Sequence, residues 1–473
     1  MTIRSHKVLL TVAAILAVAA AGDANATNGY LTHGVGTQSK GIAGSGVADP
    51  QEVAIVASNP AGIAFVGERL ELGLAAFSPM RDYETSASLA NGQGGAFTIG
   101  PNSISSENEL FFIPYVAKSW KRDEQNTIAL SFYARGGMNT EWRGGNATFD
   151  PDGPGPAPVT TFDGTYGGSI FGEDHTTAGV DLMQGFLNTA YAWNNAERTV
   201  SVGAAAIIGI QRFRAVGVSA FSPYTKTFAA SGGTELPPDL SNNGYDWSYG
   251  IGGSVGFQWN PTEKFSVALG YTSEIMMTEF DKYKDLFAEK GGFDVPAHLD
   301  FGVAFRPNAG LTFTAGLQQI YYEGIPSVSN PIQNIFACPT AGFGGTDLES
   351  CLGGKNGAGF GWQDMTVYSL GAAWKYGEDW TFRVGGSTTD QPIPGGPDPM
   401  QSQMTFNILA PGVMEEHYTI GFTKKLDSGR EFSMSFMYAP SVTLTGLQNF
   451  DPTQTVTFEM DQWDLEFSYA WGK

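Results

Sequence analysis

Apolar and polar residues alternate along most of the chain from about residue 68 onward. In the last segment Trp463, Leu465 and Phe467 fall on one face, while Asp464 and Glu466 fall between them on the other. A repeat of two residues is the period of a β-strand whose two faces meet different surroundings. The chain is therefore predicted to be all-β.

The alternating segments number about fourteen, and the connections between them alternate in length. Tight turns are predicted at residues 122–125, 194–198, 261–263, 308–310, 377–379 and 427–429, and long connections at 81–108, 144–178, 215–245 and 324–362. The strands begin near Glu68, Glu109, Asn126, Asp181, Thr199, Asp246, Lys264, Ala297, Leu311, Gln363, Trp380, Val413, Arg430 and Met460. An even strand number with short turns at one end and long loops at the other is typical of an outer-membrane barrel. Residues 67–473 are therefore predicted to form a transmembrane antiparallel β-barrel of about 14 strands.

A secreted, water-soluble β-sandwich or solenoid is the alternative to a barrel. Such a protein has no reason to keep its long loops at one end, and the sequence shows no fixed repeat. A closed barrel also pairs every backbone polar group in lipid, which an open sheet does not. Five tryptophans near strand ends fit the aromatic girdles of such barrels, namely Trp120, Trp142, Trp259, Trp380 and Trp471.

The first 26 residues have the pattern of a targeting segment. Arg4 and Lys7 precede an apolar run over residues 8–21, and Ala24-Asn25-Ala26 fits the small-residue cleavage pattern. The run is too short for a membrane-spanning helix. We predict a cleavable signal peptide over residues 1–26 and export of the mature chain; a retained anchor is the alternative.

Residues 27–66 lack the alternation and are rich in Gly and Ala. They carry Ile55, Val56, Ile63 and Phe65, which is more apolar surface than a segment hanging free in water would expose. The lumen of a barrel of about 14 strands is too wide for wall side chains alone to fill. We predict that residues 27–66 form a hatch, or plug, inside the lumen; a disordered leader is the alternative.

Composition, charge and the motifs present argue against several classes of function. The chain has 62 Gly among 473 residues, 15% charged residues and a net charge of −21. Nucleic-acid binding needs clustered positive charge, so no nucleic-acid partner is expected. The histidines are not in metal-ligand spacing and no phosphate-binding loop is present, so we expect no metal and no cofactor. Gly252-Gly253-Ser254-Val255-Gly256 matches the nucleophile-elbow pattern, but its serine lies in mid-strand, so we expect no enzyme.

The two cysteines, Cys338 and Cys351, lie close together in a segment rich in Gly and Pro. An exported protein folds in an oxidising compartment, where such a pair forms a disulfide. We predict a disulfide between them; two free thiols are the alternative.

Two further features suggest sites in the wall. Gly136 and Gly137 interrupt the third predicted strand, and glycines inside strands often mark bulges or bends. A bend there would leave a gap between neighbouring strands, unless the pair only eases barrel curvature. Arg212 and Arg214 share one face at the far end of the fifth predicted strand, where they could pair with a ligand carboxylate. They point either into an apolar pocket, which we favour, or outward to lipopolysaccharide phosphates.

Several segments resemble the FadL/TodX family of outer-membrane barrels, and the resemblance covers essentially the whole mature chain. Near the N-terminus they are Asn28-Gly29-Tyr30, Gly34-Val35-Gly36, Gly41-Ile42-Ala43-Gly44-Ser45-Gly46 and Asn59-Pro60-Ala61-Gly62. Downstream they begin at Pro296-Ala297-His298-Leu299-Asp300-Phe301, Trp362-Gln363-Asp364-Met365-Thr366 and Trp380-Thr381-Phe382-Arg383. Lys473 departs from the pattern, because the family's C-terminus is expected to be aromatic.

The resemblance implies a 14-stranded barrel plugged by an N-terminal hatch. In this family a hydrophobic ligand first meets a groove between two outer loops and then passes to a pocket inside the barrel. It leaves through a lateral gap beside a kinked third strand when the hatch moves. On this chain the hatch motif falls at Asn59, Pro60 and Ala61, and the kink falls at Gly136 and Gly137.

The resemblance places the groove loops at about residues 215–245 and 278–296. The second contains a helix-like stretch over residues 281–290, with Tyr283, Leu286 and Phe287 on one side. These three residues are the candidate ligand groove; a simple surface loop is the alternative.

We therefore expect a passive transporter in the outer membrane of a Gram-negative bacterium that takes up long-chain fatty acids or similar hydrophobic molecules. An importer of aromatic hydrocarbons such as toluene and a non-transport structural or adhesin barrel are the alternatives. A polar porin has no use for a hatch. The expected partners are the hydrophobic ligand, outer-membrane lipid and lipopolysaccharide, and the protein is expected to be a monomer.

Overall fold

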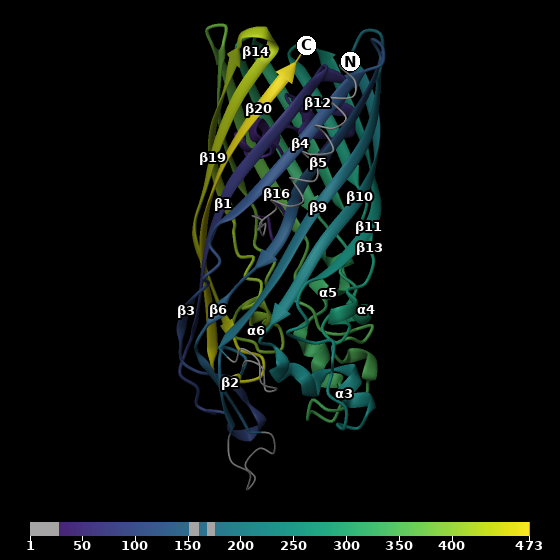
Figure 1. The fold of residues 1–473 in the computed structure, drawn as a ribbon. Coiled ribbons are helices and arrows are strands. Elements are labelled where there is room, and N and C mark those ends of the chain that lie inside the picture. Colours follow the sequence, from purple (N-terminus) through teal and green to yellow (C-terminus); the bar gives the residue numbers. More distant parts are fainter. Residues whose placement is uncertain (1–27, 151–159, 168–175, 473) are drawn as a thin grey trace.

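The computed structural model describes residues 28–150, 160–167 and 176–472 (Figure 1). One antiparallel sheet closes on itself, because its first strand, β1 (Arg69–Thr85), pairs with its last, β20 (Thr455–Gly472), from Arg69↔Gly472 to Thr85↔Val456. The other wall strands are β4 (Phe111–Lys121), β5 (Asn126–Asn139), β9 (Thr177–Asn194), β10 (Val200–Val216), β11 (Asp246–Thr262), β12 (Phe265–Thr272), β14 (His298–Asn308), β15 (Leu311–Ile320), β16 (Met365–Tyr376), β17 (Trp380–Thr388), β18 (Glu416–Leu426) and β19 (Arg430–Leu447). These 14 strands confirm the predicted barrel. The predicted signal peptide lies outside the described residues.

The wall is apolar outside and polar inside. On the outer face, side chains such as Ile251 and Leu370 are 64% and 68% exposed. On the inner face of β20, Gln462, Asp464 and Glu466 are buried. This arrangement is the reverse of a water-soluble protein and is what a lipid surrounding requires.

The two ends of the barrel differ. All six predicted tight turns join consecutive wall strands, and β1 begins and β20 ends at that same end, where Arg69 pairs with Gly472 (Figure 1). The long connections gather at the opposite end, with the short helices α3 (Lys226–Ala230), α4 (Ala288–Gly291), α5 (Pro326–Ser329) and α6 (Met404–Asn407) (Figure 1). We call these the turn end and the loop end. In an outer-membrane barrel the turn end faces the periplasm.

Several sequence predictions were wrong in detail. β9, β18 and β20 begin at residues 177, 416 and 455, not near 181, 413 and 460. The helix-like stretch over 281–290 is not one helix: η6 (Asp281–Tyr283) and α4 are separate turns, and Glu289 and Lys290 have positive φ angles of 57° and 64°. Trp142 does not belong to a girdle, because it is fully buried and donates its indole N–H to the carbonyl of Ile408 at 2.9 Å.

The long loops carry structure that periodicity did not predict. β2 (Phe97–Ile99), β7 (Asn146–Phe149) and β8 (Thr160–Asp163) form a separate small sheet. The main sheet gains three short strands in the loops, β3 (Ser103–Ser105), β6 (Trp142–Arg143) and β13 (Met276–Met277). The largest buried apolar cluster lies among these loops and the wall beneath them, so the hydrophobic core of the molecule sits at the loop end.

Candidate functional site

Residues 28–66 lie inside the barrel, and we call them the plug. Four short helical turns run through it: α2 (Thr37–Lys40), η1 (Ser45–Ala48), η2 (Val53–Ala57) and η3 (Pro60–Phe65). α2 contacts β18, β19 and β20; η1 contacts β12, β14, β15 and β16; η2 contacts β1, β4, β5 and β9; and η3 contacts β5, β9, β10 and β11. Because these contacts run around the wall, the plug occupies the lumen.

The Asn-Pro-Ala element caps the last turn of the plug. Asn59 is fully buried, and its Oδ1 accepts the N–H of Ala61 at 3.1 Å. Its Nδ2 donates to the carbonyl of Val47 at 3.4 Å. Pro60 takes the first helical position, where it leaves no N–H unpaired. The motif therefore joins η3 to η1 and keeps the plug compact.

A row of glycines lets the plug backbone lie directly on the wall. They take inward positions on eight neighbouring strands: Gly203 (β10), Gly256 (β11), Gly270 (β12), Gly302 (β14), Gly316 (β15), Gly371 (β16), Gly385 (β17) and Gly421 (β18). A Cβ added to Gly385 would lie 2.7 Å from Cα of Ile42, and one added to Gly256 would lie 2.8 Å from Cδ of Pro60. Both distances are shorter than real Cβ contacts. We call these eight residues the glycine belt, and they account for part of the glycine excess.

A buried ion-pair triad anchors the plug to β20. Nζ of Lys40 lies 2.8 Å from Asp464 and 2.7 Å from Glu466, and all three side chains are at most 4% exposed. Thr37 donates a further hydrogen bond to Glu466 at 2.7 Å. Burial alone would lower the pKa of Lys40, but the two carboxylates outweigh it and raise that pKa above its ordinary value. Lys40 is therefore charged and paired.

A second anchor joins the plug to β1. Glu71 accepts the N–H of Val53 at 2.9 Å. Glu52, on the plug, accepts the N–H groups of Ser39 at 2.7 Å and Gln38 at 3.2 Å. Burial, and after it the charge of Glu71, raises the pKa of Glu52 to about 8. Glu52 is therefore mostly protonated near neutral pH, which avoids two adjacent buried charges.

Toward the loop end, the loops and the ends of β9 and β10 line an apolar cavity. Its lining residues are Val180, Phe213, Val218, Phe221, Leu286, Phe287, Ser327, Ala358, Gly359, Phe360, Phe406 and Leu409. Two of the three predicted groove residues, Leu286 and Phe287, are among them. The third, Tyr283, packs behind the cavity with its ring 4.9 Å from that of Phe213.

The two predicted groove loops are in direct contact. Nδ2 of Asn243 donates to the carbonyl of Lys282 at 3.0 Å, and the N–H of Asp239 donates to Asp285 at 3.1 Å. The structure thus brings residues 215–245 and 278–296 together at the cavity. That a ligand binds between them stays a prediction.

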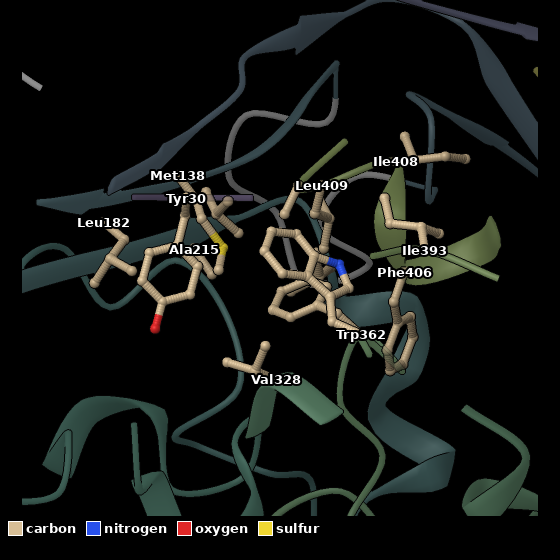
Figure 2. Packing of buried hydrophobic residues seen from close by; sticks show 14 of the residues in the cluster. Tyr30, Met138, Leu182, Ala215, Val328, Trp362, Ile393, Phe406, Ile408 and Leu409 are labelled. Carbon is tan, nitrogen blue, oxygen red and sulfur yellow. The ribbon is translucent and has the colours of Figure 1, made fainter. Parts of the chain in front are cut away.

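Trp362 forms the inner boundary of this apolar region (Figure 2). It is 1% exposed, and its indole N–H donates to Asn407 at 2.6 Å. Its ring lies 5.8 Å from that of Tyr30 on the plug and 6.3 Å from that of Phe360 in the apolar cavity. Figure 2 shows Trp362 between Tyr30 on one side and Phe406 on the other. Trp362 therefore contacts both the plug, through Tyr30, and the lining of the outer cavity, through Phe360.

Beyond Trp362 lies a smaller cavity that contains a buried cation. It is lined by Gly29, Tyr30, Arg81, Gly137, Met138, Asn139, Trp362, Ala410, Pro411, Gly412 and Met460. Arg81, on β1, is 3% exposed and donates to the carbonyls of Asn108 and Asn139. No carboxylate in the described part of the chain forms an ion pair with it. Sequence reasoning missed Arg81; its only signal is an arginine at an inward register position of β1.

The double glycine lies at a break in the wall. The register of β5 against β9 shifts between Ala134 and Gly136, which is a β-bulge. On its other side β5 pairs with β4 only as far as Tyr133↔Tyr115, so residues 134–139 do not pair with β4. The plug pairs there instead: the N–H of Gly137 donates to the carbonyl of Tyr30 at 3.1 Å. The first residues of the plug thus cover the inner side of the break.

A third, polar cavity lies deeper, between the plug and β14–β16. Arg135, at the bulge, lines it together with His33 of the plug and Asp300 of β14. Arg135 is 6% exposed, and its guanidinium contacts Nε2 of His298 at 2.5 Å. Burial, and after it the charge of Lys40, lowers the pKa of His33 well below its ordinary value, so His33 is neutral. A second buried arginine therefore lies on the inner side of the break.

The favoured placement of Arg212 and Arg214 in a pocket is wrong. They lie on the outer face of β10 with Ile208, which is 48% exposed, and Phe213 between them points inward. Their guanidinium carbons lie 4.1 and 5.0 Å from the ring centre of Tyr245. The error has a physical cause: a period of two separates the faces but does not say which one is inside, and in this barrel the apolar face is the outer one.

Cys338 and Cys351 form the predicted disulfide, and both are fully buried in the loops. In the chain-entropy model, closing a loop of this length stabilises the folded state by about 3 kcal/mol. Replacing both cysteines with Ser is expected to leave the barrel folded and to expose the loop end to protease. Limited proteolysis of purified protein tests this; cleavage at the unmodified rate would contradict it.

The described residues contain neither a metal-binding group nor a membrane-spanning helix. Within residues 28–150, 160–167 and 176–472, no group of three His, Cys, Asp or Glu side chains is placed to hold a metal ion. No helix in those ranges is long and apolar enough to cross a membrane.

The geometry defines a class of protein: a closed 14-stranded barrel whose N-terminal segment fills the lumen and whose long loops enclose an apolar cavity. Solved structures share this fold. The P. putida toluene transporter TodX is 14% identical over 93% of this chain and 99% of its own, with a TM-score of 0.56. A Pseudomonas aeruginosa FadL homologue is 13% identical over 94% of this chain and 99% of its own, with a TM-score of 0.58. The Ralstonia pickettii toluene transporter TbuX is 14% identical over 93% of this chain and 98% of its own, with a TM-score of 0.54.

At these identities the likeness establishes the fold. The chain has the fold of the TodX and FadL outer-membrane barrels, which confirms the fold class that the sequence resemblance implied. No protein-family model and no curated protein matches the sequence.

Proposed function

We propose that the protein is a passive outer-membrane transporter, not an enzyme, that takes up long-chain fatty acids or similar hydrophobic molecules. The observation that carries the proposal is a pair of cavities: an apolar one between the outer loops, and a second one, on the other side of Trp362, that is lined by plug residues and by Gly137 at the break in the wall. Solved structures that share the fold include toluene transporters and a FadL homologue, which supports the substrate class.

The proposed path follows the cavities inward. A ligand enters between the loops at residues 215–245 and 278–296 and contacts Leu286 and Phe287. It passes Trp362 to the cavity that contains Arg81. A shift of residues 30–32, which cover the break at Gly136 and Gly137, then opens a lateral exit into the membrane. The capping bonds of Asn59, Pro60 and Ala61 keep the plug a unit, so that it moves as a hatch.

Arg81 distinguishes two candidate substrates. A buried cation without a carboxylate partner is costly unless an anion joins it, which favours a ligand with a carboxylate head. Arg135, farther along the inner side of the break, offers a second cation. An aromatic hydrocarbon such as toluene needs neither residue, so an aromatic-hydrocarbon importer is the second candidate function.

Arg81→Gln is expected to reduce uptake of labelled long-chain fatty acid by roughly tenfold or more, because a hydrogen bond to a charged group contributes about 1.5–3 kcal/mol. Toluene uptake is expected to stay unchanged. Both are measured in cells that lack their own outer-membrane importer. The control is Arg214→Ala, which removes a cation from the outer face.

The outcomes separate the candidates. If Arg81→Gln lowers uptake of fatty acid and of toluene equally, Arg81 is not a partner for the ligand carboxylate. Toluene uptake without fatty-acid uptake in the unmodified protein would favour the second candidate function. Flux of neither would leave a structural or adhesin barrel.

The oligomeric state, the targeting segment and the lipid contacts are also proposals. The protein is proposed to act as a monomer, delivered to the outer membrane by a cleavable signal peptide over residues 1–26. Arg212 pairs with Asp181 at 3.6 Å, and we propose lipopolysaccharide phosphates as further partners of Arg212 and Arg214 on the outer face.

A further inference from the structure

The turn end of the barrel holds a large open cavity that the proposed path does not use. Its volume is about 620 Å³. Its walls come from the inner sides of the strand ends around the tight turns at 261–263, 308–310, 377–379 and 427–429, and its floor comes from Gln38, Asp49 and Gln51 of the plug. In an outer-membrane barrel this cavity opens to the periplasm. We call it the vestibule.

The vestibule has the opposite charge to the rest of the protein. The whole chain carries a net charge of −21, yet six basic residues and only three acidic ones line this cavity. The basic residues are Arg69, Lys264, Arg306, Lys375, Arg383 and Lys425. Two of the acids are already paired, Glu431 with Arg69 and Asp49 with Arg306. A cleft lined by one sign of charge concentrates ions of the other sign.

Arg383 is the buried centre of this charge. It is 4% exposed on the inner face of β17, and its guanidinium donates to the side-chain oxygens of Gln38, Gln51 and Thr423. All three partners are neutral, and Nε has no hydrogen-bond partner. No carboxylate of the described residues forms an ion pair with Arg383, Lys375 or Lys425. A buried guanidinium that faces an aqueous cavity with neutral partners only is suited to bind an oxyanion.

The hydrogen bonds of Arg383 and the ion pair of Arg306 also hold the plug against the wall. Gln38 and Gln51 belong to the plug and bind it to β17 through Arg383. Asp49 binds it to β14 through Arg306. A charged oxyanion forms stronger hydrogen bonds with a guanidinium than a neutral amide does. An anion that takes the place of Gln38 and Gln51 would therefore detach the plug from this side of the wall.

We propose that the vestibule is a binding site for a small oxyanion, a carboxylate or a phosphate, and that its occupation loosens the plug from the periplasmic side. The site goes beyond the proposed function and does not depend on the substrate. By linkage, an anion that favours the loosened plug binds more tightly when the plug is loose. Lys375 and Lys425, which touch no plug residue through an ion pair, gather the anion, and Arg383 receives it.

The test uses an introduced thiol, because both native cysteines are in the disulfide. Ser45, in η1, is fully buried beside Gly316 and Gly371. Ser45→Cys therefore reports loosening of the plug through its rate of labelling by a water-soluble maleimide. The purified full chain is labelled in sodium phosphate, in sodium octanoate, and in sodium chloride of equal ionic strength. Phosphate or octanoate is expected to raise the rate roughly fivefold or more, the lower end of usual coupling factors.

A matched pair of variants locates the effect. Lys375→Gln with Lys425→Gln removes two vestibule cations without touching the bonds of Arg383, and is expected to abolish the increase while leaving the rate in chloride unchanged. Lys424→Gln makes the same chemical change at the neighbouring residue, which lies on the outer face beside Trp380. It is expected to keep the anion-dependent increase in labelling rate. Calorimetric titration with phosphate and with octanoate tells which oxyanion binds. Equal labelling rates in all three salts would overturn the proposal. So would a Lys424→Gln variant that loses the anion-dependent increase as fully as the Lys375→Gln, Lys425→Gln variant does.

Discussion

Replacing Lys40 with Met is expected to release the plug from β20 and to turn the barrel into a conducting pore. The substitution removes the only cation of the triad and leaves Asp464 and Glu466 facing each other with their charges buried. Removing one partner of a buried pair typically costs about 3–5 kcal/mol, because the remaining charge has no compensation. That cost falls on the plugged state, in which these side chains are shut off from water. Single-channel conductance of the purified protein in a planar bilayer measures the outcome.

A rescue variant makes this prediction specific. Adding Asp464→Asn and Glu466→Gln to Lys40→Met removes the buried charges and is expected to restore most of the closed state. Lys424→Met, on the outer face, is the control for loss of a lysine and is expected to stay closed. Conductance of Lys40→Met no higher than that of the control would show that the triad does not hold the plug.

Replacing Gly385 with Ala is expected to displace the plug from β17. The new Cβ would lie 2.7 Å from Cα of Ile42, and neither backbone can move aside cheaply within a closed sheet. Overpacking of this kind typically costs about 1–3 kcal/mol. The expected results are a raised conductance and loss of the plugged state at a lower temperature, while the barrel itself stays folded.

The neighbouring glycine provides the control. A Cβ at Gly386 would meet nothing closer than the carbonyl of His417 at 3.4 Å, which is ordinary contact. Gly386→Ala has the same backbone and entropy effects in the same strand, so it is expected to behave as the unmodified protein. If both variants open the pore equally, strand flexibility and not plug contact explains the effect. If neither does, the glycine belt does not position the plug.

The strands were predictable because each lies between two unlike surroundings. Outward side chains meet lipid and inward ones meet the polar lumen, so every wall strand repeats the same period of two, as Trp463 and Asp464 show in β20. The loops have no such constraint. Residues 281–290 show apolar spacing that suggests a helix, yet tertiary packing of Phe280, Tyr283 and Phe287 on Phe213 splits the stretch into two turns.

The candidate site was predictable only in part. The bulge at Gly136 lies where the double glycine indicated, because a glycine pair inside a strand is a local signal. Arg81 and Arg135 gave no such signal. Arg135 contacts His298, which is 163 residues away, and Arg81 stands out because no carboxylate of the described residues forms an ion pair with it. Arg212 and Arg214 were misplaced for the same reason, because nothing local tells the inner face of a strand from the outer.

By itself, the sequence determined the strand number, the closed barrel, the unequal ends and the cysteine pair. These follow from periodicity, turn lengths and chemistry that act over a few residues. Only the tertiary structure decided which face of each strand is inside, which glycines receive the plug, and that buried arginines lie beside the break in the wall and at the periplasmic mouth. Those properties arise where strands distant in the sequence converge on one lumen, so no single segment contains them.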